Sequence, residues 1–317
     1  MKKFVAIGHV DTGKSSLCGH LLYKCNYIDE RNMEKIRTKA KEDGMESWIY
    51  ARVLDIYEEE AEKGKTHEFG SVIFNHNDKQ YQLIDTPGHQ KFVRSMIEGI
   101  SQEVNIAMLL ISMKDNEFNS SFGSGMMKEH MLLARSVGIE YMVLIANKMD
   151  LIDWDEKKCK EKVKQVTKYL VKDLGWPKEK LFVVPISAFD GVGLVDTLDM
   201  PDWYKGKSFL NTLDSLPDKP RQSFNDLTES CRFVCDVNNF GTEGTVMIPG
   251  YLCVAHLNGE EIEATIDKIN GKPFLRGGDK GKCIFVLSEK ILMAPGMRVI
   301  YRKGNNTVGF GTVTVVK

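Results

Sequence analysis

Residues Gly8 to Ser15, with the sequence GHVDTGKS, decide the fold of the first part of this chain. They match the pattern GxxxxGK[ST] and follow the apolar run Phe4–Ile7, which suits a short buried strand. Strand, loop and helix in this order predict a phosphate-binding loop, because backbone N–H groups and the positive end of the helix dipole then face phosphate oxygens. The residues expected to contact the phosphates are His9, Val10, Asp11, Thr12, Gly13, Lys14, Ser15 and Ser16.

Two side chains of this loop have separate expected roles. Lys14 is predicted to neutralise the terminal phosphates, and the Ser15 hydroxyl is predicted to bind the Mg²⁺ ion that bridges them. The alternative is a chance match in a glycine-containing loop, which the order of strand, loop and helix disfavours.

Later segments are predicted to respond to the terminal phosphate. Thr66, in a glycine-containing break, is expected to reach Mg²⁺ as a switch residue when that phosphate is present. In the sequence DTPGH, Asp85 ends a strand and is expected to hold Mg²⁺ through water, while the N–H of Gly88 binds the phosphate. His89 is predicted to be the catalytic residue that orients the attacking water. A structural histidine is the alternative, which the DTPGH context disfavours.

The tetrapeptide NKMD predicts recognition of guanine. The carboxylate of Asp150 can accept hydrogen bonds from N1 and the exocyclic amine of guanine, which adenine cannot supply in that arrangement. Asn147 and Lys148, whose stem stacks on the base, complete the motif. Ser187 and Ala188 are expected to brace the guanine from the other side through their backbone N–H groups. The motifs follow one another at the carboxyl ends of predicted strands, which indicates a GTP-binding domain over residues 1–216.

Hydrophobic patterning predicts the architecture of this domain. Apolar runs predict an α/β fold, a phosphate-loop GTPase domain with a mostly parallel sheet flanked by helices. The expected strands are 4–7, 71–74, 81–84, 106–112, 141–146 and 181–185, and the expected helices are 17–23, 29–44, 48–62, 128–137 and 156–173.

Composition excludes several classes of protein. The 317 residues carry 43 basic and 44 acidic side chains, a formal charge of -1, which does not indicate sequence-specific nucleic-acid binding. No apolar run approaches membrane-spanning length, and Met1 lies two lysines before the first strand, so we expect a cytoplasmic protein without a membrane partner. We also expect the protein to be monomeric.

The seven cysteines show no metal-ligand spacing; Cys231 and Cys235 are expected to be buried free thiols.

The set GHVDTGKS, DTPGH, NKMD and SA resembles the translational GTPases. It is most similar to the branch with eukaryotic elongation factor one alpha, the ribosome-rescue GTPases and the GTP-binding subunit of the eukaryotic peptide chain release factor. Within this branch EKGKTHEFG is similar to the release-factor switch, which carries GKT where elongation factors carry GIT, and residues 200–206 and 209–214 point the same way. The resemblance implies a Mg²⁺-dependent GTPase that converts GTP to GDP and phosphate, slowly without ribosome or partner.

The remainder of the chain is predicted to form one small β-barrel. Residues 217–230 look like a polar linker, and residues 231–317 are rich in short β runs and glycine turns. Residues 248–251 and 297–309 resemble the third domain of the family, so its middle barrel is expected to be missing. Because that barrel docks on the small ribosomal subunit and holds the aminoacyl end of tRNA in elongation factors, its absence disfavours tRNA delivery.

Two arginines near the end of the chain are predicted to bind a partner. Arg298 and Arg302 match the arginines of the GRFxxR segment with which the release-factor subunit holds the class-I peptide chain release factor. The glycine and phenylalanine of that segment are replaced by Met297 and Val299. The alternative is that both arginines are solvated barrel charges.

The sequence leaves more than one function open. The leading hypothesis is a termination GTPase whose partners are the ribosome and a class-I release factor. A nucleotide-regulated adaptor without productive ribosomal hydrolysis is the alternative from another class, and a ribosome-rescue or elongation-type GTPase uses the same parts. An intact His89 favours an enzyme, because a pure binder has no need of it.

Overall fold

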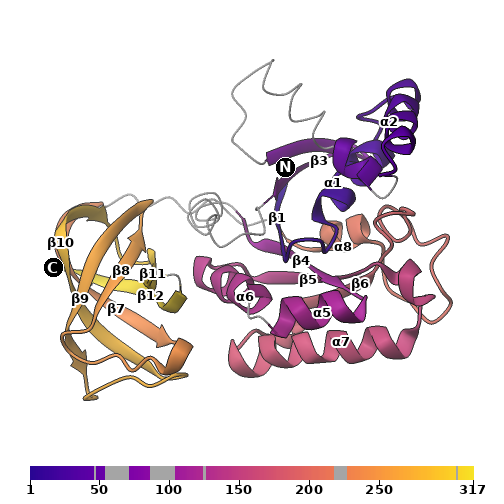
Figure 1. Cartoon of the computed structure of the whole chain (residues 1–317). Helices are drawn as coiled ribbons and strands as arrows, with labels where there is room; N and C mark the ends of the chain where they lie inside the picture. Colours follow the sequence, from indigo (N-terminus) through magenta and orange to yellow (C-terminus); the bar gives the residue numbers. More distant parts are fainter. Residues whose placement is uncertain (46–47, 54–70, 86–103, 124–125, 218–226, 305) are drawn as a thin grey trace.

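The computed structural model describes residues 1–45, 48–53, 71–85, 104–123, 126–217, 227–304 and 306–317. These residues form an N-terminal sheet covered by helices and a C-terminal barrel beside it (Figure 1). Three predicted residues, Thr66, Gly88 and His89, lie outside the described residues, and the side chain of Asp85 is not described. Their predicted roles therefore stay predictions.

A six-stranded sheet forms the centre of the N-terminal domain, in the order β2-β3-β1-β4-β5-β6. Only β2 runs antiparallel to its neighbour, which confirms the mostly parallel sheet. The strands are β1 (Lys2–Gly8), β2 (Ser71–His76), β3 (Lys79–Asp85), β4 (Ile106–Ser112), β5 (Tyr141–Asn147) and β6 (Leu181–Pro185). Every residue of β4 is buried, as expected for a central strand that is covered on both faces.

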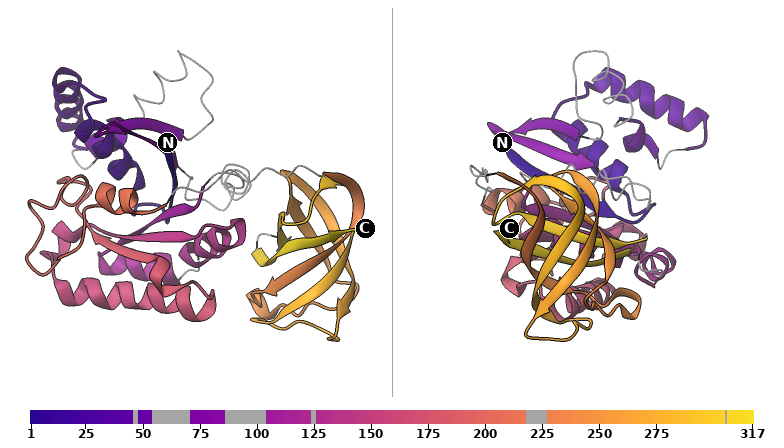
Figure 2. Two further views of the ribbon diagram at one scale, coloured as in Figure 1. Left: turned by 180° about the vertical axis from the view of Figure 1, so that it is seen from behind. Right: turned by 90° about the vertical axis from the view of Figure 1, so that its left-hand side faces the viewer.

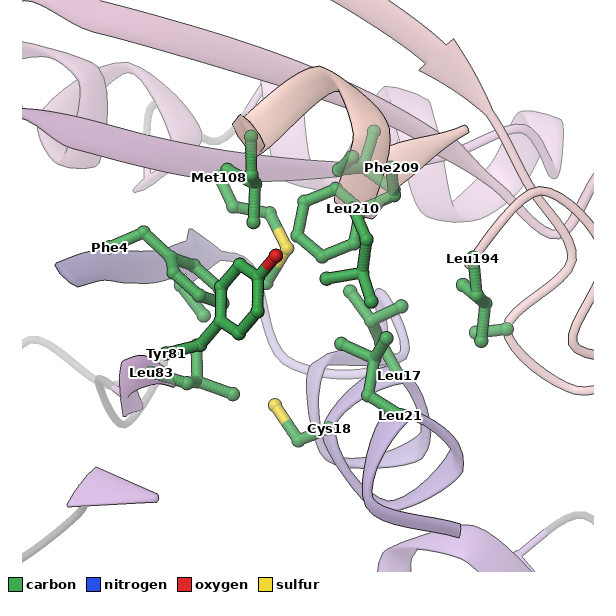
Figure 3. Packing of buried hydrophobic residues seen from close by; sticks show 14 of the residues in the cluster. Phe4, Leu17, Cys18, Leu21, Tyr81, Leu83, Met108, Leu194, Phe209 and Leu210 are labelled. Atoms are coloured by element: carbon green, nitrogen blue, oxygen red, sulfur yellow. The ribbon is translucent and has the colours of Figure 1, made fainter. Parts of the chain in front are cut away.

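Helices cover both faces of this sheet because its strands bury alternate residues on opposite sides. Leu109 of β4 packs on the face that carries α5, α6 and α7, whereas Met108 packs with Leu17 and Phe209 on the face of α1, α2 and α8 (Figure 3). The helices are α1 (Lys14–Lys24), α2 (Glu30–Glu42), α5 (Asp115–Gly123), α6 (Met126–Val137), α7 (Glu156–Lys168) and α8 (Phe209–Ser215).

Local structure departs from the predictions at several points. The β2–β3 hairpin turns at Asn77 and Asp78, both with positive φ, so the two strands extend beyond the predicted ranges 71–74 and 81–84. Helix α7 ends at Lys168 and continues as a single π-helical turn, Tyr169–Asp173. Helix α5 was not predicted, because its sequence DNEFNSSFG has a weak apolar pattern.

The C-terminal domain is a closed antiparallel barrel with the strand order β10-β7-β12-β11-β8-β9. Its strands are β7 (Thr228–Asn239), β8 (Leu252–Leu257), β9 (Glu260–Asn270), β10 (Lys280–Met293), β11 (Arg298–Lys303) and β12 (Asn306–Val316). Strand β7 begins inside the segment predicted as linker. All seven cysteines of the chain are free, and all but the half-buried Cys231 are buried.

Helix α6 joins the two domains. Glu129 of α6 accepts hydrogen bonds from the backbone N–H and the hydroxyl of Thr307 in β12, at 3.2 and 2.8 Å. Ile300 of β11 is buried against the apolar cluster of the N-terminal domain. The views in Figures 1 and 2 agree that α6 is the helix nearest the barrel. We call the contacts of α6 with Thr307, Ile300, Arg298 and Arg302 the α6–barrel joint.

Candidate functional site

The phosphate loop connects β1 to α1 at the carboxyl edge of the sheet. Gly13 adopts the left-handed conformation, with φ 91°, immediately before the first residue of α1. A Cβ atom at Gly13 would lie 2.4 Å from Nδ2 of Asn147, so only glycine fits between the loop and the end of β5. This close contact fixes the loop next to the N-terminus of α1, where backbone N–H groups can bind an anion.

Lys14 lies folded over the loop. Its ammonium donates hydrogen bonds to the carbonyls of Gly8 and His9, at 2.9 and 2.8 Å, and its side chain is largely buried. Buried His130 of α6 lies close to the same charge, and burial, together with Lys14 and His9, lowers its pKa to about 4. The imidazole is therefore neutral at pH 7, which leaves Lys14 as the positive charge of the loop.

Asn147 ties the loop to two later motifs. Its amide nitrogen donates to the carbonyl of Thr12 at 2.8 Å, and its amide oxygen accepts from the N–H of Ala188 at 2.9 Å. Asn147 is 1% exposed, so both bonds are shielded from water. The three segments that the sequence predicted to form one site are therefore brought together by a single side chain.

Lys148 is held by residues that sequence reasoning missed. The backbone of Lys148 adopts the left-handed conformation, and the Lys148 ammonium forms an ion pair of 2.7 Å with Glu117 of α5. The same Glu117 oxygen accepts a hydrogen bond from Ser112 at 2.6 Å. Only their place in the sequence could have indicated them, because neither belongs to a motif: Ser112 ends the buried strand β4, and Glu117 follows five residues later. They position the lysine stem that was predicted to stack on the base.

Asp150 differs from Lys14 and Lys148, whose charged groups are paired within the chain. Within the described residues, its Oδ1 atom is buried and has no hydrogen-bond partner. Leaving a buried charged acceptor unpaired costs roughly 1–3 kcal/mol or more, so we expect a ligand or a water molecule to satisfy this atom of the half-buried side chain. The unsatisfied acceptor fits the two donors on the edge of guanine.

The backbone N–H groups of Ser187 and Ala188, which were predicted to brace the guanine, form hydrogen bonds within the chain. The N–H of Ser187 donates to the carbonyl of Val192 at 3.2 Å, and that of Ala188 is used by Asn147. Neither N–H group is free to brace the base in this arrangement. Behind them, His20 lies 2.8 Å from the carbonyl of Ala188 and stacks on Tyr50, and burial lowers its pKa to about 4.

Of the predicted Mg²⁺ ligands, the structure describes the side chain of Ser15. This residue is exposed in the first turn of α1, next to the phosphate loop in the sequence. Hydroxyl and carboxylate oxygens are donors that Mg²⁺ accepts, so the predicted set Ser15, Thr66 and Asp85 has suitable chemistry. Among the residues that the structure describes, no group of three or more His, Cys, Asp or Glu side chains could hold a metal ion.

Arg298 and Arg302, the residues predicted to bind a partner, both lie where the barrel meets α6. Arg302 is 9% exposed at the α6–barrel joint; burial lowers the pKa of its guanidinium, and the nearby Glu129 and Glu261 oppose that effect. Arg298 keeps part of its side chain in solvent, but its guanidinium donates to the carbonyls of Arg135 and Ser136, at 3.1 and 3.0 Å. In this arrangement both arginines serve contacts within the chain.

These features define a phosphate-loop protein with a site suited to guanine nucleotides. The family model of the elongation factor Tu GTP binding domain matches residues 1–218. The chain therefore belongs to this family, the translational GTPases.

Two curated relatives are equally similar to the chain. The GTP-binding subunit of the eukaryotic peptide chain release factor from Schizosaccharomyces pombe is 41% identical over 218 residues, which are 67% of this chain and 33% of that protein. Elongation factor 1-alpha 2 from Euplotes crassus is 41% identical over 219 residues, 68% of this chain and 49% of that protein. The chain thus spans about half or less of these relatives.

A solved structure shares the whole architecture. The GTPase-like domain of Ski7 from Saccharomyces cerevisiae, bound to GDP and inorganic phosphate, has a TM-score of 0.77, with 98% of this chain and 97% of that chain covered. At 13% identity this likeness concerns the fold. No helix among the described residues has the length and apolar character needed to cross a membrane.

Proposed function

We propose that this protein binds GTP and hydrolyses it to GDP and phosphate as a translation factor of the cytoplasm. The observation that carries the proposal is the constellation around Asn147. One buried amide joins the phosphate loop to the Ser187–Ala188 segment, and Asp150, with its unpaired Oδ1 atom, follows Asn147 three residues later at the end of β5. Such a preformed acceptor selects guanine, because adenine would leave the carboxylate buried without its donors.

The residues of this chain have distinct roles in the proposed reaction. Lys14 and the N–H groups at the start of α1 hold the phosphates, and Lys148 and Asp150 hold the base. Mg²⁺ would be held by Ser15, Thr66 and Asp85, and when bound it neutralises charge that develops on the phosphate oxygens. His89 orients the attacking water. Since Thr66 and His89 lie outside the described residues, their roles rest on the sequence.

We further propose that the protein acts in translation termination, with the ribosome and a class-I release factor as partners. The support is the switch sequence GKT, together with the similarity to the release-factor subunit. Similarity to elongation factor 1-alpha is equally high, so overall identity does not distinguish termination from elongation. Because Arg298 and Arg302 take part in the α6–barrel joint, a class-I factor would bind another face of the barrel or open the joint.

Single-turnover GTP hydrolysis on ribosomes tests this proposal. The wild-type chain and His89→Ala are compared with and without a class-I release factor, and GTP binding is measured in parallel. We expect a burst that needs both ribosome and factor, and a loss of at least about 10²-fold in rate for the variant, typical of a missing general base or water-orienting group.

Two outcomes would point elsewhere. A burst without any class-I factor would favour an elongation or rescue role. No burst with intact GTP binding would mean that the nucleotide acts as a conformational signal, which is the adaptor function.

A further inference from the structure

A groove lies on the outer side of α7, away from the nucleotide motifs. It has a volume of about 780 Å³ and runs between α7 with its π-helical turn, strand β6 and the segment at Trp203. Figure 1 shows α7 along the edge of the domain that lies opposite α2. None of the lining residues belongs to the phosphate loop, to NKMD or to the α6–barrel joint, so the groove is separate from the site described above.

The floor of the groove is apolar and already ordered. It is formed mainly by Val163, Val171, Val183, Pro185, Trp203 and Tyr204. The indole N–H of Trp203 donates to the carbonyl of Trp154 at 3.0 Å, and the hydroxyl of Tyr204 donates to the carbonyls of Val183 and Lys207, at 3.1 and 2.8 Å. Because the polar atoms of both side chains already form hydrogen bonds within the chain, a ligand in the groove would contact mainly the carbon atoms of Trp203 and Tyr204.

A row of lysines borders this floor. Lys160, Lys164, Lys168 and Lys172 recur at every fourth position and line the groove from one edge of the helix, and Lys178 adds a fifth charge from the segment before β6. Lys160 forms an ion pair with Glu156. Within the described part of the chain, the other four have no carboxylate partner within ion-pair distance, and all are exposed.

The charge pattern is specific to the groove. No acidic residue in the described part of the chain lines it: Glu161, Asp173, Glu179 and Asp202 are exposed nearby, and Glu156 pairs with Lys160 at one end. Lysines at regular spacing repel one another, so an acidic ligand would relieve that repulsion. An apolar floor bordered by one sign of charge indicates a ligand with apolar side chains on one face and acidic side chains beside them.

We propose that this groove docks an acidic amphipathic peptide segment of a partner protein. Apolar side chains of the segment would pack on Trp203 and Val171, and its carboxylates would pair with Lys164, Lys168 and Lys172. Apolar burial then supplies most of the affinity, while the lysines set the choice of partner and the association rate. RNA fits less well, because phosphate contacts along the lysines would leave the valines and Pro185 without apolar contacts.

Fluorescence anisotropy with synthetic probes tests the groove on the full chain. The first probe is a labelled peptide of glutamate and leucine with leucines at i, i+3, i+4 and i+7. The comparison probes replace glutamate by lysine, replace leucine by serine, or are a single-stranded oligouridylate. We expect the first probe to bind at least about tenfold more tightly than each of the others, because only it matches both the charge and the floor.

Charge reversal on α7 locates the binding. Lys164→Glu/Lys168→Glu should weaken binding of the glutamate–leucine peptide by about tenfold or more, since two attractions become repulsions. The matched control Lys157→Glu/Lys158→Glu changes the net charge equally on the same helix, at exposed positions outside the groove, and should change affinity by less than about twofold. GDP binding and the thermal midpoint of each variant report whether it is folded.

Several results would overturn the proposal. They are no binding of the first probe to the wild-type chain, equal binding of the serine or lysine probe, displacement of the peptide by oligouridylate at matched charge, or equal effects of the two variant pairs. The probe comparison uses only the wild-type chain, so it decides the matter even if the groove variant does not fold.

Discussion

Charged atoms are buried both at the α6–barrel joint and at the NKMD motif, which we call the guanine edge. The two places differ in whether these atoms have hydrogen-bond partners. In the joint, Glu129 accepts two hydrogen bonds from Thr307 and faces Arg302. At the guanine edge, Oδ1 of Asp150 is buried and has no partner among the described residues. The buried Nε of Arg135 at the end of α6 also has no partner among the described residues, so an unsatisfied atom alone does not define a ligand site. Asp150 differs because its unpaired acceptor belongs to the NKMD motif, where a ligand with two donors would satisfy it.

The largest expected effect tests the unsatisfied carboxylate. Asp150→Asn should lower the affinity for GDP by about 10²- to 10⁴-fold, because two hydrogen bonds to a charged acceptor contribute roughly 1.5–3 kcal/mol each. The same variant should gain affinity for xanthosine diphosphate, which has an oxygen where guanine has its amine and so accepts from the new amide. Isothermal titration measures both affinities. Asp153→Asn, in the same turn but exposed, is the matched control; an equal loss there would mean that the turn, and not the acceptor, was perturbed.

The second prediction concerns the amide that assembles the site. Asn147→Ala should lower the free energy of unfolding by about 2–4 kcal/mol, since the carbonyl of Thr12 and the N–H of Ala188 are left buried without partners at roughly 1–3 kcal/mol each. Urea unfolding of the nucleotide-free chain gives this value. Asn211→Ala, exposed on α8, should change it by less than about 0.5 kcal/mol. Similar losses in the two variants would show that Asn147 has no special role.

The third prediction tests the α6–barrel joint. Thr307→Val keeps the shape and the backbone N–H bond to Glu129 but removes the hydroxyl bond of 2.8 Å, which should cost about 1.5–3 kcal/mol because the acceptor is charged. We expect GDP affinity to stay unchanged. Denaturant unfolding and GDP titration measure both effects. Thr314→Val, also in β12, serves as the control, and an equal cost there would exclude a special contribution from the joint.

The smallest expected effect concerns how the free energy of unfolding changes with pH. His20 and Glu129 should change it in opposite directions. Burial lowers the pKa of His20 from 6.5 to about 4, so the unfolded chain binds more protons between these values and stability rises with pH there. Burial raises the pKa of Glu129 above 4.5, so the folded state binds the proton more tightly and stability falls as pH rises from 4.5 towards the folded pKa. Urea unfolding over a pH series should show that His20→Gln flattens the rise and Glu129→Gln removes the fall. Parallel curves for either variant and the wild type would contradict the assignment.

Sequence patterns predicted the sheet and the loop well because both depend on local information. The buried run at β4 and the GxxxxGK[ST] loop specify strand, turn and helix within a few residues of themselves. The hydrogen bonds of Ser187 and Ala188 could not be predicted in this way, because the acceptors of their N–H groups lie in Asn147 and Val192, which only the folded chain brings near. Their role at the base stays a prediction.

The partner role of Arg298 and Arg302 stays a prediction, and the sequence did not indicate their contacts with α6. The motif match located two arginines on a barrel strand, but whether that strand faces solvent or α6 depends on how two domains dock. The approach of Arg298 to α6 also requires Gly138, where a Cβ atom would lie 2.9 Å from the arginine Nε. No local pattern relates these two positions, which are far apart in the sequence.

The most direct test of the account is the affinity of the wild-type chain for GDP and ADP, measured by isothermal titration in the presence of magnesium. We predict that GDP binds at least about 10²-fold more tightly than ADP, because only guanine supplies two donors to Asp150. Equal affinity for the two nucleotides, or binding of neither, would contradict the claim that this edge of the sheet is a guanine-nucleotide site.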